Sequence, residues 1–365
     1  MKFLLVSPFT SAAGSAIRFW NIAIELKRAG HEVVLVDRKA VNGKTLFFSD
    51  EIRYYNCFST GNLFIDIITS LFFNIFMFLR NIDCDVYYAL KPAPNNCIPA
   101  LMAKLLRKRI IIDIDDLDYA YLESKIKRGL LKMFFDSLPG FFPLVTYHTP
   151  NLNRYLSSRI KISKDRLYYL AQGISDEFLK INPDNYNPHP KSLIYVATLG
   201  ITSDFGDLIP SINSLCKDHP ELFMSVVGDG CRRLEFEKEI RRLGIEKQVS
   251  FKGQLDHREL PAFIASHRIG INYMRPSEVN QCRAILKIRE YLACGLDVVC
   301  NNVGDVELFK PHINIEADVE YIRKRIDSIL KTQPIRNILG RKYILDNFRW
   351  SSIISDFIKA GALCG

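Results

Sequence analysis

Lys287–Cys300 reads K-I-R-E-Y-L-A-C-G-L-D-V-V-C, and its pattern indicates the fold class most clearly. Ile288 and Tyr291 recur at helical spacing, so they can share one buried face. Gly295 can adopt the left-handed conformation that ends a helix. Val298-Val299 is typical of a strand inside a sheet. A helix that ends at a glycine and leads into a buried strand is one unit of an α/β domain.

The same alternation of strand and helix appears twice along the chain. An apolar strand at 3–7 precedes an amphipathic helix at 16–29 and a second strand at 31–37. After residue 192 the pattern recurs, with strands at 193–197, 223–227, 249–252 and 269–273. These runs predict an α/β fold with two Rossmann-like doubly wound parallel-sheet domains facing a central cleft. The length of 365 residues suits two cores, because single cores stop growing at about 250–300 residues.

The segment between the two runs predicts the domain boundary. Ile181–Lys191 contains three prolines and three asparagines, which is typical of a linker. We therefore expect an N-terminal domain over 1–185 and a C-terminal domain over 192–345. The last residues, 346–365, are expected to form a terminal helix that packs back on the N-terminal domain.

Composition limits the partners of the chain. The net charge of +9 favours an anionic partner, such as nucleotide phosphates or anionic lipid. No segment resembles a nucleic-acid-binding module, so nucleic acid is not expected as a partner. The nine cysteines form no C-x-x-C pair, and Met1–Val6 is too short for the core of a signal peptide. We expect a cytoplasmic protein.

Three motifs in the second half of the chain carry a family resemblance. G-D-G stands at Gly228–Gly230, R-L-G-I-x-x-x-V-x-F-x-G at 242–253, and E-Y-L-A-C-G-L-x-V-V begins at Glu290. At these distances they resemble the C-terminal domain of the "glycosyl transferases group 1", glycosyltransferase family 4, whose members have the GT-B fold. The resemblance covers roughly 190–310 well and 1–40 more loosely. It implies a retaining glycosyltransferase that moves a sugar from a nucleotide diphosphate donor to a lipid-linked or envelope glycan acceptor.

The resemblance also implies how the donor, a UDP- or GDP-sugar, binds without a metal or other cofactor. Glu290 is expected to accept hydrogen bonds from the ribose, because a carboxylate offers two acceptor oxygens to a vicinal diol. The alternative for Glu290 is a surface glutamate paired with Lys287 or Arg283 on its own helix. The remaining donor-binding positions are expected at Gly228, Asp229, Gly230, Leu255 and Thr198.

Two departures from the family pattern concern the phosphate and sugar end of the donor. Cys282 stands where the family carries the first glutamate of E-x7-E. The loop Ala197–Gly206 lacks the family's arginine and lysine, each worth about 1.5–3 kcal/mol in charge-assisted hydrogen bonds. We predict that Arg283 and Lys287 replace this pair as the catalytic cations. A solvated surface arginine remains the alternative for Arg283.

The loop Pro8–Arg18 corresponds to the family's glycine-bearing loop near the donor phosphates. Gly14 and Arg18 are expected to contribute there, since a helix N-terminus offers backbone amides to an anion. The alternative is a plain turn between a strand and a helix. The family's histidine in this domain is not evident; Lys91 stands near that position, and His148 is a lone histidine of the kind that is more often structural.

Asp113–Asp118 reads D-I-D-D-L-D directly after an apolar strand. Three interpretations stay open: carboxylates that hold a metal ion, carboxylates at the cleft edge that bind acceptor hydroxyls, and structural caps at a strand end. The family resemblance implies that the enzyme needs no metal ion, which favours the second and third interpretations.

Two segments suggest contact with a membrane. Leu63–Leu79 is apolar but short for a span of about 20 residues, so we expect a buried or interfacial helix. Ser124–Phe135 places basic residues on one face and apolar residues on another, which predicts a helix on an anionic membrane surface. A core-facing helix is the alternative. Together these segments suggest a protein that is peripheral on the inner face of the membrane.

Two other functional classes remain as alternatives. A non-catalytic partner protein would explain the missing cation pair together with Cys282. A sugar-nucleotide epimerase shares the two-domain fold, but the histidines and carboxylates usual in its cleft cannot be placed here.

Overall fold

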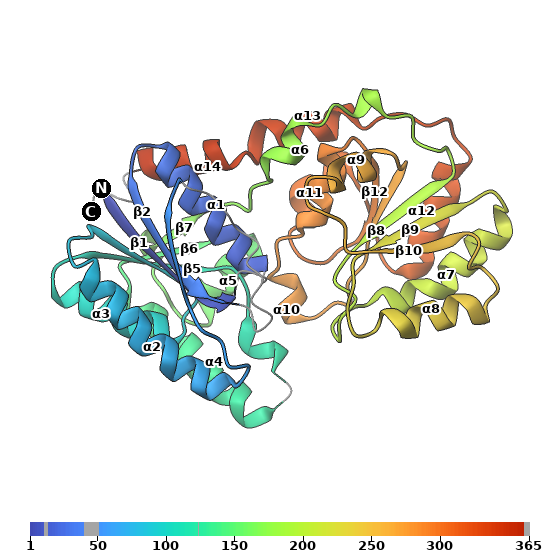
Figure 1. Ribbon diagram of the computed structural model, residues 1–365. Coiled ribbons are helices and arrows are strands. Elements are labelled where there is room, and N and C mark those ends of the chain that lie inside the picture. Colours follow the sequence, from blue (N-terminus) through green and yellow to red (C-terminus); the bar gives the residue numbers. More distant parts are fainter. Residues whose placement is uncertain (11–13, 40–50, 123, 361–365) are drawn as a thin grey trace. The chain divides into compact units, whose positions relative to one another are not determined.

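The chain forms two compact units, each built on one parallel sheet (Figure 1). The computed structural model describes residues 1–10, 14–39, 51–122 and 124–360. The first unit comprises Met1–Gly173, Cys282–Ala284 and Trp350–Gly365, and the second comprises Ile174–Gln281 and Ile285–Arg349. The predicted α/β fold with two parallel-sheet domains is confirmed.

The first unit contains a seven-stranded sheet of order β3-β2-β1-β4-β5-β6-β7, whose strand pairs are parallel. Strand β4 is buried along its whole length, as expected for a strand covered on both faces. The strands are β1 (Lys2–Thr10), β2 (Glu32–Arg38), β3 (Arg53–Cys57), β4 (Val86–Leu90), β5 (Arg109–Ile114), β6 (Leu144–Tyr147) and β7 (Leu167–Tyr169).

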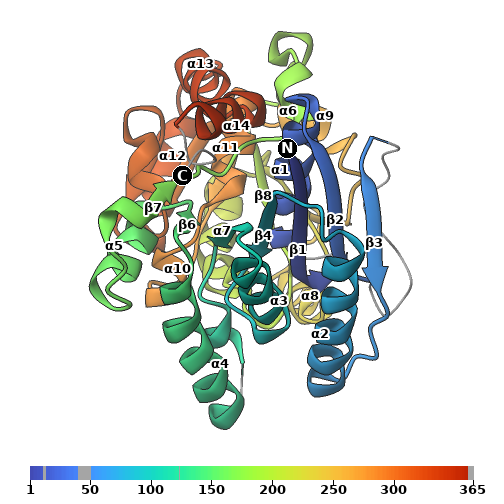
Figure 2. The same ribbon diagram turned by 90° about the vertical axis from the view of Figure 1, so that its left-hand side faces the viewer.

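Helices cover both faces of this sheet (Figures 1 and 2). Helices α1 and α14 pack on each other on one face, and α2 packs on α3 on the opposite face. No helix in the described ranges has the length and apolar content needed to cross a bilayer. The helices are α1 (Gly14–Arg28), α2 (Leu63–Arg80), α3 (Pro94–Leu105), α4 (Lys125–Ser137), α5 (Pro150–Ser158) and α14 (Trp350–Lys359).

The second unit contains a six-stranded parallel sheet of order β10-β9-β8-β11-β12-β13. This order reverses direction at β8, which is the doubly wound arrangement. The strands are β8 (Ser192–Val196), β9 (Phe223–Val227), β10 (Val249–Gly253), β11 (Ile269–Asn272), β12 (Asp297–Asn301) and β13 (Asn314–Glu316). The helices are α6 (Asp176–Lys180), α7 (Phe205–Asp218), α8 (Arg233–Arg242), α9 (Leu260–Ala265), α10 (Glu278–Gln281), α11 (Leu286–Ala293), α12 (Val319–Leu330) and α13 (Ile338–Asn347).

The boundary between the units comes before the proline-rich linker. Ile174 pairs with Arg349, and its N–H donates to the Phe348 carbonyl. Further along, the Arg341 guanidinium donates to the Ile181 carbonyl. The segment from Ile174 onward is therefore held by the second unit, and the first unit ends at Gly173 rather than at the expected residue 185.

The terminal helix α14 is part of the first unit. The Trp350 ring lies directly over Gly173, where an added Cβ would come within 2.5 Å of the ring. Only a glycine admits the indole at this position. Residues 361–365 of the predicted terminal segment lie outside the described residues.

Candidate functional site

A glycine turn at the carboxyl edge of the second sheet brings two backbones into contact. Gly228 and Gly230 have φ of 124° and 158°. A Cβ on Gly228 would lie 1.8 Å from the Ala197 carbonyl oxygen, and one on Gly230 would lie 2.4 Å from the Leu199 carbonyl oxygen. The glycines are therefore required so that the loop after β9 can pass against the loop after β8.

The Gly228 and Gly230 amides of this turn already have partners within the protein. The Gly228 N–H donates to the Gly253 carbonyl at 2.8 Å, and the Gly230 N–H donates to the Asp229 carboxylate at 2.8 Å. The exposed Asp229 also pairs with Arg233 at 3.3 Å. The turn therefore shapes the edge of the sheet, and the amides of its two glycines are engaged within the protein.

The other predicted donor-binding positions lie at the same edge. Thr198 is exposed in the loop after β8, and Leu255 is half-buried in the loop after β10. Because β8, β9 and β10 are parallel neighbours, the loops that follow them meet at one edge of the sheet. The structure thus gathers Thr198, Gly228–Gly230 and Leu255 along one border.

Glu290 is a buried residue of α11, with 2% of its surface exposed. Its carboxylate accepts a hydrogen bond of 2.7 Å from Lys287 Nζ, one turn earlier. The predicted pairing with Lys287 is therefore present, but Glu290 is not the surface residue that the structural alternative assumed.

Tyr291 holds α11 against the sheet. Its hydroxyl accepts a hydrogen bond from the Val196 N–H at 2.8 Å, at the end of β8. Its ring lies on Gly270 of β11, where a Cβ would come within 2.4 Å of the ring. Gly295, with φ of 74°, ends the helix two residues before β12. These contacts fix Glu290 near the carboxyl end of β8.

A buried ion pair that the sequence did not indicate sets the start of the same helix. Arg289 Nη2 lies 2.5 Å from Asp305 Oδ2, and both side chains are fully buried. Asp305 also accepts the Ile285 N–H at 2.9 Å, and the guanidinium lies over the rings of Phe309 and Phe348. The partners are 16 residues apart, so no local spacing could have revealed the pair.

Arg283 and Lys287 are assigned to different units. Cys282–Ala284 belongs to the first unit, where the Cys282 carbonyl accepts a hydrogen bond from the Thr149 hydroxyl at 2.9 Å. Arg283 Nε lies 3.6 Å from Asp116, and its guanidinium lies over the ring of Tyr121. Lys287 lies in the second unit, on Glu290. Their joint role at a diphosphate stays a prediction.

Arg18 is an interior residue of the first unit, in contrast to the expectation that it faces a phosphate. Its guanidinium pairs with both oxygens of Asp113, at 2.9 and 3.1 Å. It also donates to the carbonyls of Leu170 and Ala171. A guanidinium engaged in this way holds α1 to the strands and is not available to a ligand. Gly14 begins α1, and residues 11–13 before it lie outside the described residues.

The remaining carboxylates of the D-I-D-D-L-D segment surround a buried lysine. Lys91 Nζ lies 2.6 Å from Asp118 and 3.1 Å from Asp115. Burial raises the pKa of Asp118 to about 7, although the lysine charge opposes this shift. Burial also acts on Asp115, but there the charges of Lys91 and His148 prevail and lower its pKa. Lys91 and His148 thus both lie at this edge.

This arrangement bears on the three interpretations of the segment. Asp113 is structural because it binds Arg18, whereas Asp116 accepts a hydrogen bond from Tyr121 and faces Arg283. Within the described ranges, no three histidine, cysteine or carboxylate side chains are placed to hold a metal ion. Asp115, Asp116 and Asp118 remain candidates for binding a polar ligand at the carboxyl ends of β4 and β5.

Comparison with known proteins agrees with both the sheets and the motifs. Residues 179–343 match the family described as "Glycosyl transferases group 1". The gpi3 subunit of phosphatidylinositol N-acetylglucosaminyltransferase from Schizosaccharomyces pombe is 21% identical over 321 residues. That match covers 84% of this chain but 66% of the relative, just under two thirds of its length.

Two solved structures share the whole fold. Sucrose-phosphate synthase from Thermosynechococcus elongatus superposes with a TM-score of 0.74 at 16% identity, over 100% of this chain and 99% of that one. Anabaena Alr3699/HepE in complex with UDP gives a TM-score of 0.75 at 14% identity, over 99% and 100%. The two-sheet architecture is therefore the GT-B fold of glycosyltransferases.

Proposed function

We propose that this chain, whose residues 179–343 match the family described as "Glycosyl transferases group 1", is a glycosyltransferase that moves a sugar with retention from a nucleotide diphosphate donor to a lipid-linked or envelope glycan acceptor. The observation that carries the proposal is the buried carboxylate of Glu290, on a helix held to the end of β8. Two carboxylate oxygens suit the two ribose hydroxyls of a nucleotide. The HepE structure in complex with UDP supports a nucleotide sugar as the donor, which we propose to be a UDP- or GDP-sugar.

In this proposal the second unit supplies the contacts to the ribose and the base of the donor. Thr198 and the turn Gly228–Gly230 border the donor on one side, and the backbone near Leu255 meets the base. The diphosphate gains negative charge as the sugar leaves, so fixed cations stabilise the transition state. We assign this role to Lys287 and Arg283, since the loop Ala197–Gly206 contains no basic residue.

The first unit supplies the acceptor contacts. Asp115 and Asp116 lie where β5 ends, and carboxylates are suited to accept hydrogen bonds from the hydroxyl groups of a glycan or an inositol. A lipid-linked acceptor is supported by the S. pombe relative, whose name contains both phosphatidylinositol and N-acetylglucosaminyltransferase. Such an acceptor places the protein at the inner face of a membrane, with the basic helix at Ser124–Phe135 on anionic lipid.

A non-catalytic role is the second candidate, and one observation favours it. Cys282 is buried in the first unit at the position where the family carries a sugar-contacting glutamate. A thiol cannot accept hydrogen bonds from sugar hydroxyls as a carboxylate does. Binding of sugar nucleotides without turnover, for each of the UDP- and GDP-sugars tested, would assign the chain to this class.

A thermal-shift screen against UDP- and GDP-sugars tests the donor proposal. A ligand at 100 times its Kd stabilises the native state by about 2.7 kcal/mol. We expect Glu290→Gln to weaken donor binding at least tenfold, because it replaces the carboxylate at the ribose. Glu239→Gln is the matched control, since Glu239 belongs to the same unit but pairs with Arg242 on the surface. Unchanged donor affinity in Glu290→Gln would contradict the proposal.

The same preparation tests the two cations. Arg283→Ala and Lys287→Ala are each expected to lower the rate of sugar transfer at least tenfold, since both side chains are assigned to the leaving diphosphate. If neither substitution changed the rate or the affinity for the donor, the assignment of these two residues would be wrong.

A further inference from the structure

Helix α2 buries a row of polar side chains inside the first unit and exposes six large apolar side chains on the outside, while Met77 and Phe78 near its end are buried. Asp66, Ser70 and Asn74 are buried and recur every four residues. A residue two positions before or after a member of this row lies on the opposite face, because two residues turn an α-helix by about 200°. That outer face carries exposed side chains at Phe64, Ile65, Ile68, Phe72, Phe76 and Leu79.

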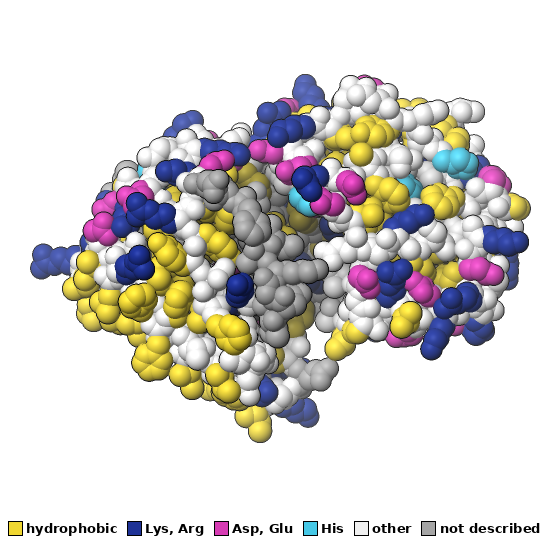
Figure 3. Space-filling view, viewed as in Figure 1, with side chains coloured by type: hydrophobic (Ala, Val, Ile, Leu, Met, Phe, Trp, Pro, Cys, Tyr) yellow, Lys and Arg dark blue, Asp and Glu magenta, His cyan; other side chains and the backbone are white. Residues whose placement is uncertain are grey.

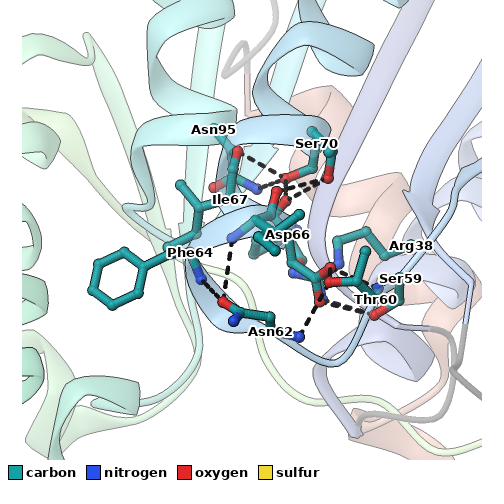
Figure 4. Close-up of polar contacts among 12 residues, drawn as sticks. Arg38, Ser59, Thr60, Asn62, Phe64, Asp66, Ile67, Ser70 and Asn95 are labelled. Atoms are coloured by element: carbon teal, nitrogen blue, oxygen red, sulfur yellow. Dashed lines mark hydrogen bonds and ion pairs between the residues drawn. The ribbon is translucent and has the colours of Figure 1, made fainter.

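The inner face is held by hydrogen bonds. Figure 4 shows Asp66 turned toward Arg38, Ser59 and Thr60, while the Phe64 ring points away from them. Ser70 accepts a hydrogen bond from Asn95 at 2.9 Å, and Asn74 donates to the Asn95 carbonyl. These contacts fix the rotation of the helix, so the apolar face cannot turn inward.

Hydrogen bonding also keeps the buried carboxylate charged. Burial by itself raises the pKa of Asp66, but the hydrogen bonds from Thr60 and Ser59 and the charge of Arg38 outweigh it and lower the pKa. A surface helix of a soluble protein normally turns its apolar side toward the core and its polar side toward water. Helix α2 has the opposite polarity, with a buried ion pair on its inner side and exposed phenylalanines on its outer side.

The apolar face continues onto the neighbouring helices. Figure 3 shows hydrophobic side chains gathered over α2 and α3. Helix α3, which packs on α2, adds the exposed Ile98 and Leu105, and α4 adds Ile126 and Met133. A contiguous exposed apolar surface of this kind marks an interaction site.

Positive charge accompanies this face. The ammonium of Lys127 in α4 lies over the Phe64 ring of α2, 5.6 Å from its centroid. Helices α2, α3 and α4 contain two acidic residues: Asp66 is buried, and Asp136 is paired with Lys132. The basic residues of the three helices are Arg80, Lys104, Lys125, Lys127, Arg128 and Lys132.

We propose that the outer face of α2 inserts into the surface of an anionic bilayer, with the basic residues of α3 and α4 on the lipid headgroups. The occupant is lipid because the face combines phenylalanine and isoleucine side chains with flanking cations, which suits acyl chains beneath anionic headgroups. The helix lies in the interface and does not span the bilayer, since it is too short and rests on the sheet. This inference adds the outer face of α2 to the membrane contact already proposed for the basic helix. It rests on the proposed function in one respect, because a lipid-linked acceptor is the reason for the protein to bind a membrane.

Vesicle co-sedimentation of the full chain tests the inference. We expect binding to phosphatidylcholine vesicles with 30% phosphatidylglycerol to be at least tenfold tighter than to pure phosphatidylcholine. The double variant Phe72→Ser/Phe76→Ser is expected to bind the anionic vesicles at least tenfold more weakly. The matched control is Ile338→Ser/Leu339→Ser in α13, whose side chains are 67% and 71% exposed, against 67% and 55% for the two phenylalanines. This control is expected to bind like the wild type.

A second measurement reports insertion directly. In Phe72→Trp, vesicles that contain brominated lipid are expected to quench fluorescence beyond the level seen for the wild type, whereas Leu339→Trp shows no added quenching. No binding of the wild type to anionic vesicles would overturn the inference, and so would an equal loss of binding in the two double variants. Self-association that depends on Phe72 and Phe76, without vesicle binding, would assign the face to a second copy of the chain and overturn it too.

The donor thermal shift, measured on the same samples, separates this inference from the proposed function. A double variant that loses vesicle binding but keeps the donor shift is the expected result. Vesicle binding without any thermal shift by a donor would support the membrane-binding surface on α2 and contradict the donor proposal.

Discussion

Charged side chains in the interior of this chain are stabilised by different kinds of partner. Asp113 and Asp305 each receive an arginine, Arg18 and Arg289, so their buried charges are compensated. Asp37 in β2 instead accepts hydrogen bonds from the Tyr54 hydroxyl, at 2.8 and 2.7 Å. A neutral hydroxyl compensates a buried carboxylate less well than a guanidinium does.

Asp37 is therefore expected to make stability depend on pH. Burial raises its pKa to about 7, and the hydrogen bond from Tyr54 only partly opposes this. Because the folded pKa lies above the unfolded value of about 3.9, the contribution of Asp37 is complete below about pH 4 and is lost as the pH rises toward 7. At pH 8 we expect Asp37→Asn to raise the free energy of unfolding by on the order of 2–4 kcal/mol relative to the wild type.

Urea unfolding at pH 4, 6 and 8 measures this effect. The difference between Asp37→Asn and the wild type should be smallest at pH 4 and grow toward pH 8. Tyr54→Phe is the companion variant. It is expected to lose more stability than the wild type between pH 4 and pH 8, because it removes the hydrogen bond that lowers the pKa of Asp37. Parallel pH profiles for the wild type and Asp37→Asn would show that the carboxyl is not responsible.

At the scale of elements, the loop between β9 and α8 depends on close contact with its neighbour. Gly228→Ala is expected to destabilise the second unit, because the new methyl group meets the Ala197 carbonyl oxygen at 1.8 Å. Gly244→Ala is the matched control: Gly244 also has positive φ, of 72°, but has no atom within 4 Å of an added Cβ. We expect about 1–3 kcal/mol for the backbone strain at Gly244 and at least twice that at Gly228.

Chemical denaturation of the two variants gives this comparison. Equal losses of stability would mean that backbone strain alone explains both sites and that the contact between the two loops contributes little.

The elements that local patterns describe could be predicted from the sequence. Gly295 ends α11 as expected, and Val298-Val299 lies inside β12. Both depend on interactions within a few residues. The rotation of α2 could not be predicted, because its apolar content alone suggested a buried or interfacial helix. Asp66 determines that rotation through Arg38, which lies 28 residues away in the chain.

The candidate site shows the same division. The pairing of Glu290 with Lys287 follows from their spacing in the helix, but the burial of Glu290 does not, because every residue from 288 to 293 is buried. Arg18 looked equally suitable for a ligand, but its partner Asp113 is 95 residues away, and only the fold brings them together. Side chains whose role depends on a distant partner need the structure before a function can be assigned to them.

In the whole molecule, a bound donor is expected to stabilise the second unit more than the first. Each unit has its own sheet and buried core, and the proposed contacts to the ribose and the base, from Glu290, Gly228–Gly230 and Leu255, all belong to the second, whereas Arg283 at the diphosphate belongs to the first. The two tryptophans of the chain, Trp20 and Trp350, both belong to the first. Tryptophan fluorescence therefore follows one unit, whereas circular dichroism follows both.

We expect a bound sugar nucleotide to shift the two signals differently. At a concentration of 100 times its Kd, the donor raises the free energy of unfolding of the second unit by about 2.7 kcal/mol. The circular dichroism transition should rise in temperature, while the fluorescence transition of the first unit moves little. Glu290→Gln should abolish the difference and leave both curves as they are without ligand. If the donor raised both transitions equally, the units would unfold as one; if it raised only the fluorescence transition, the donor would bind the first unit and the assignment of Glu290 would fail.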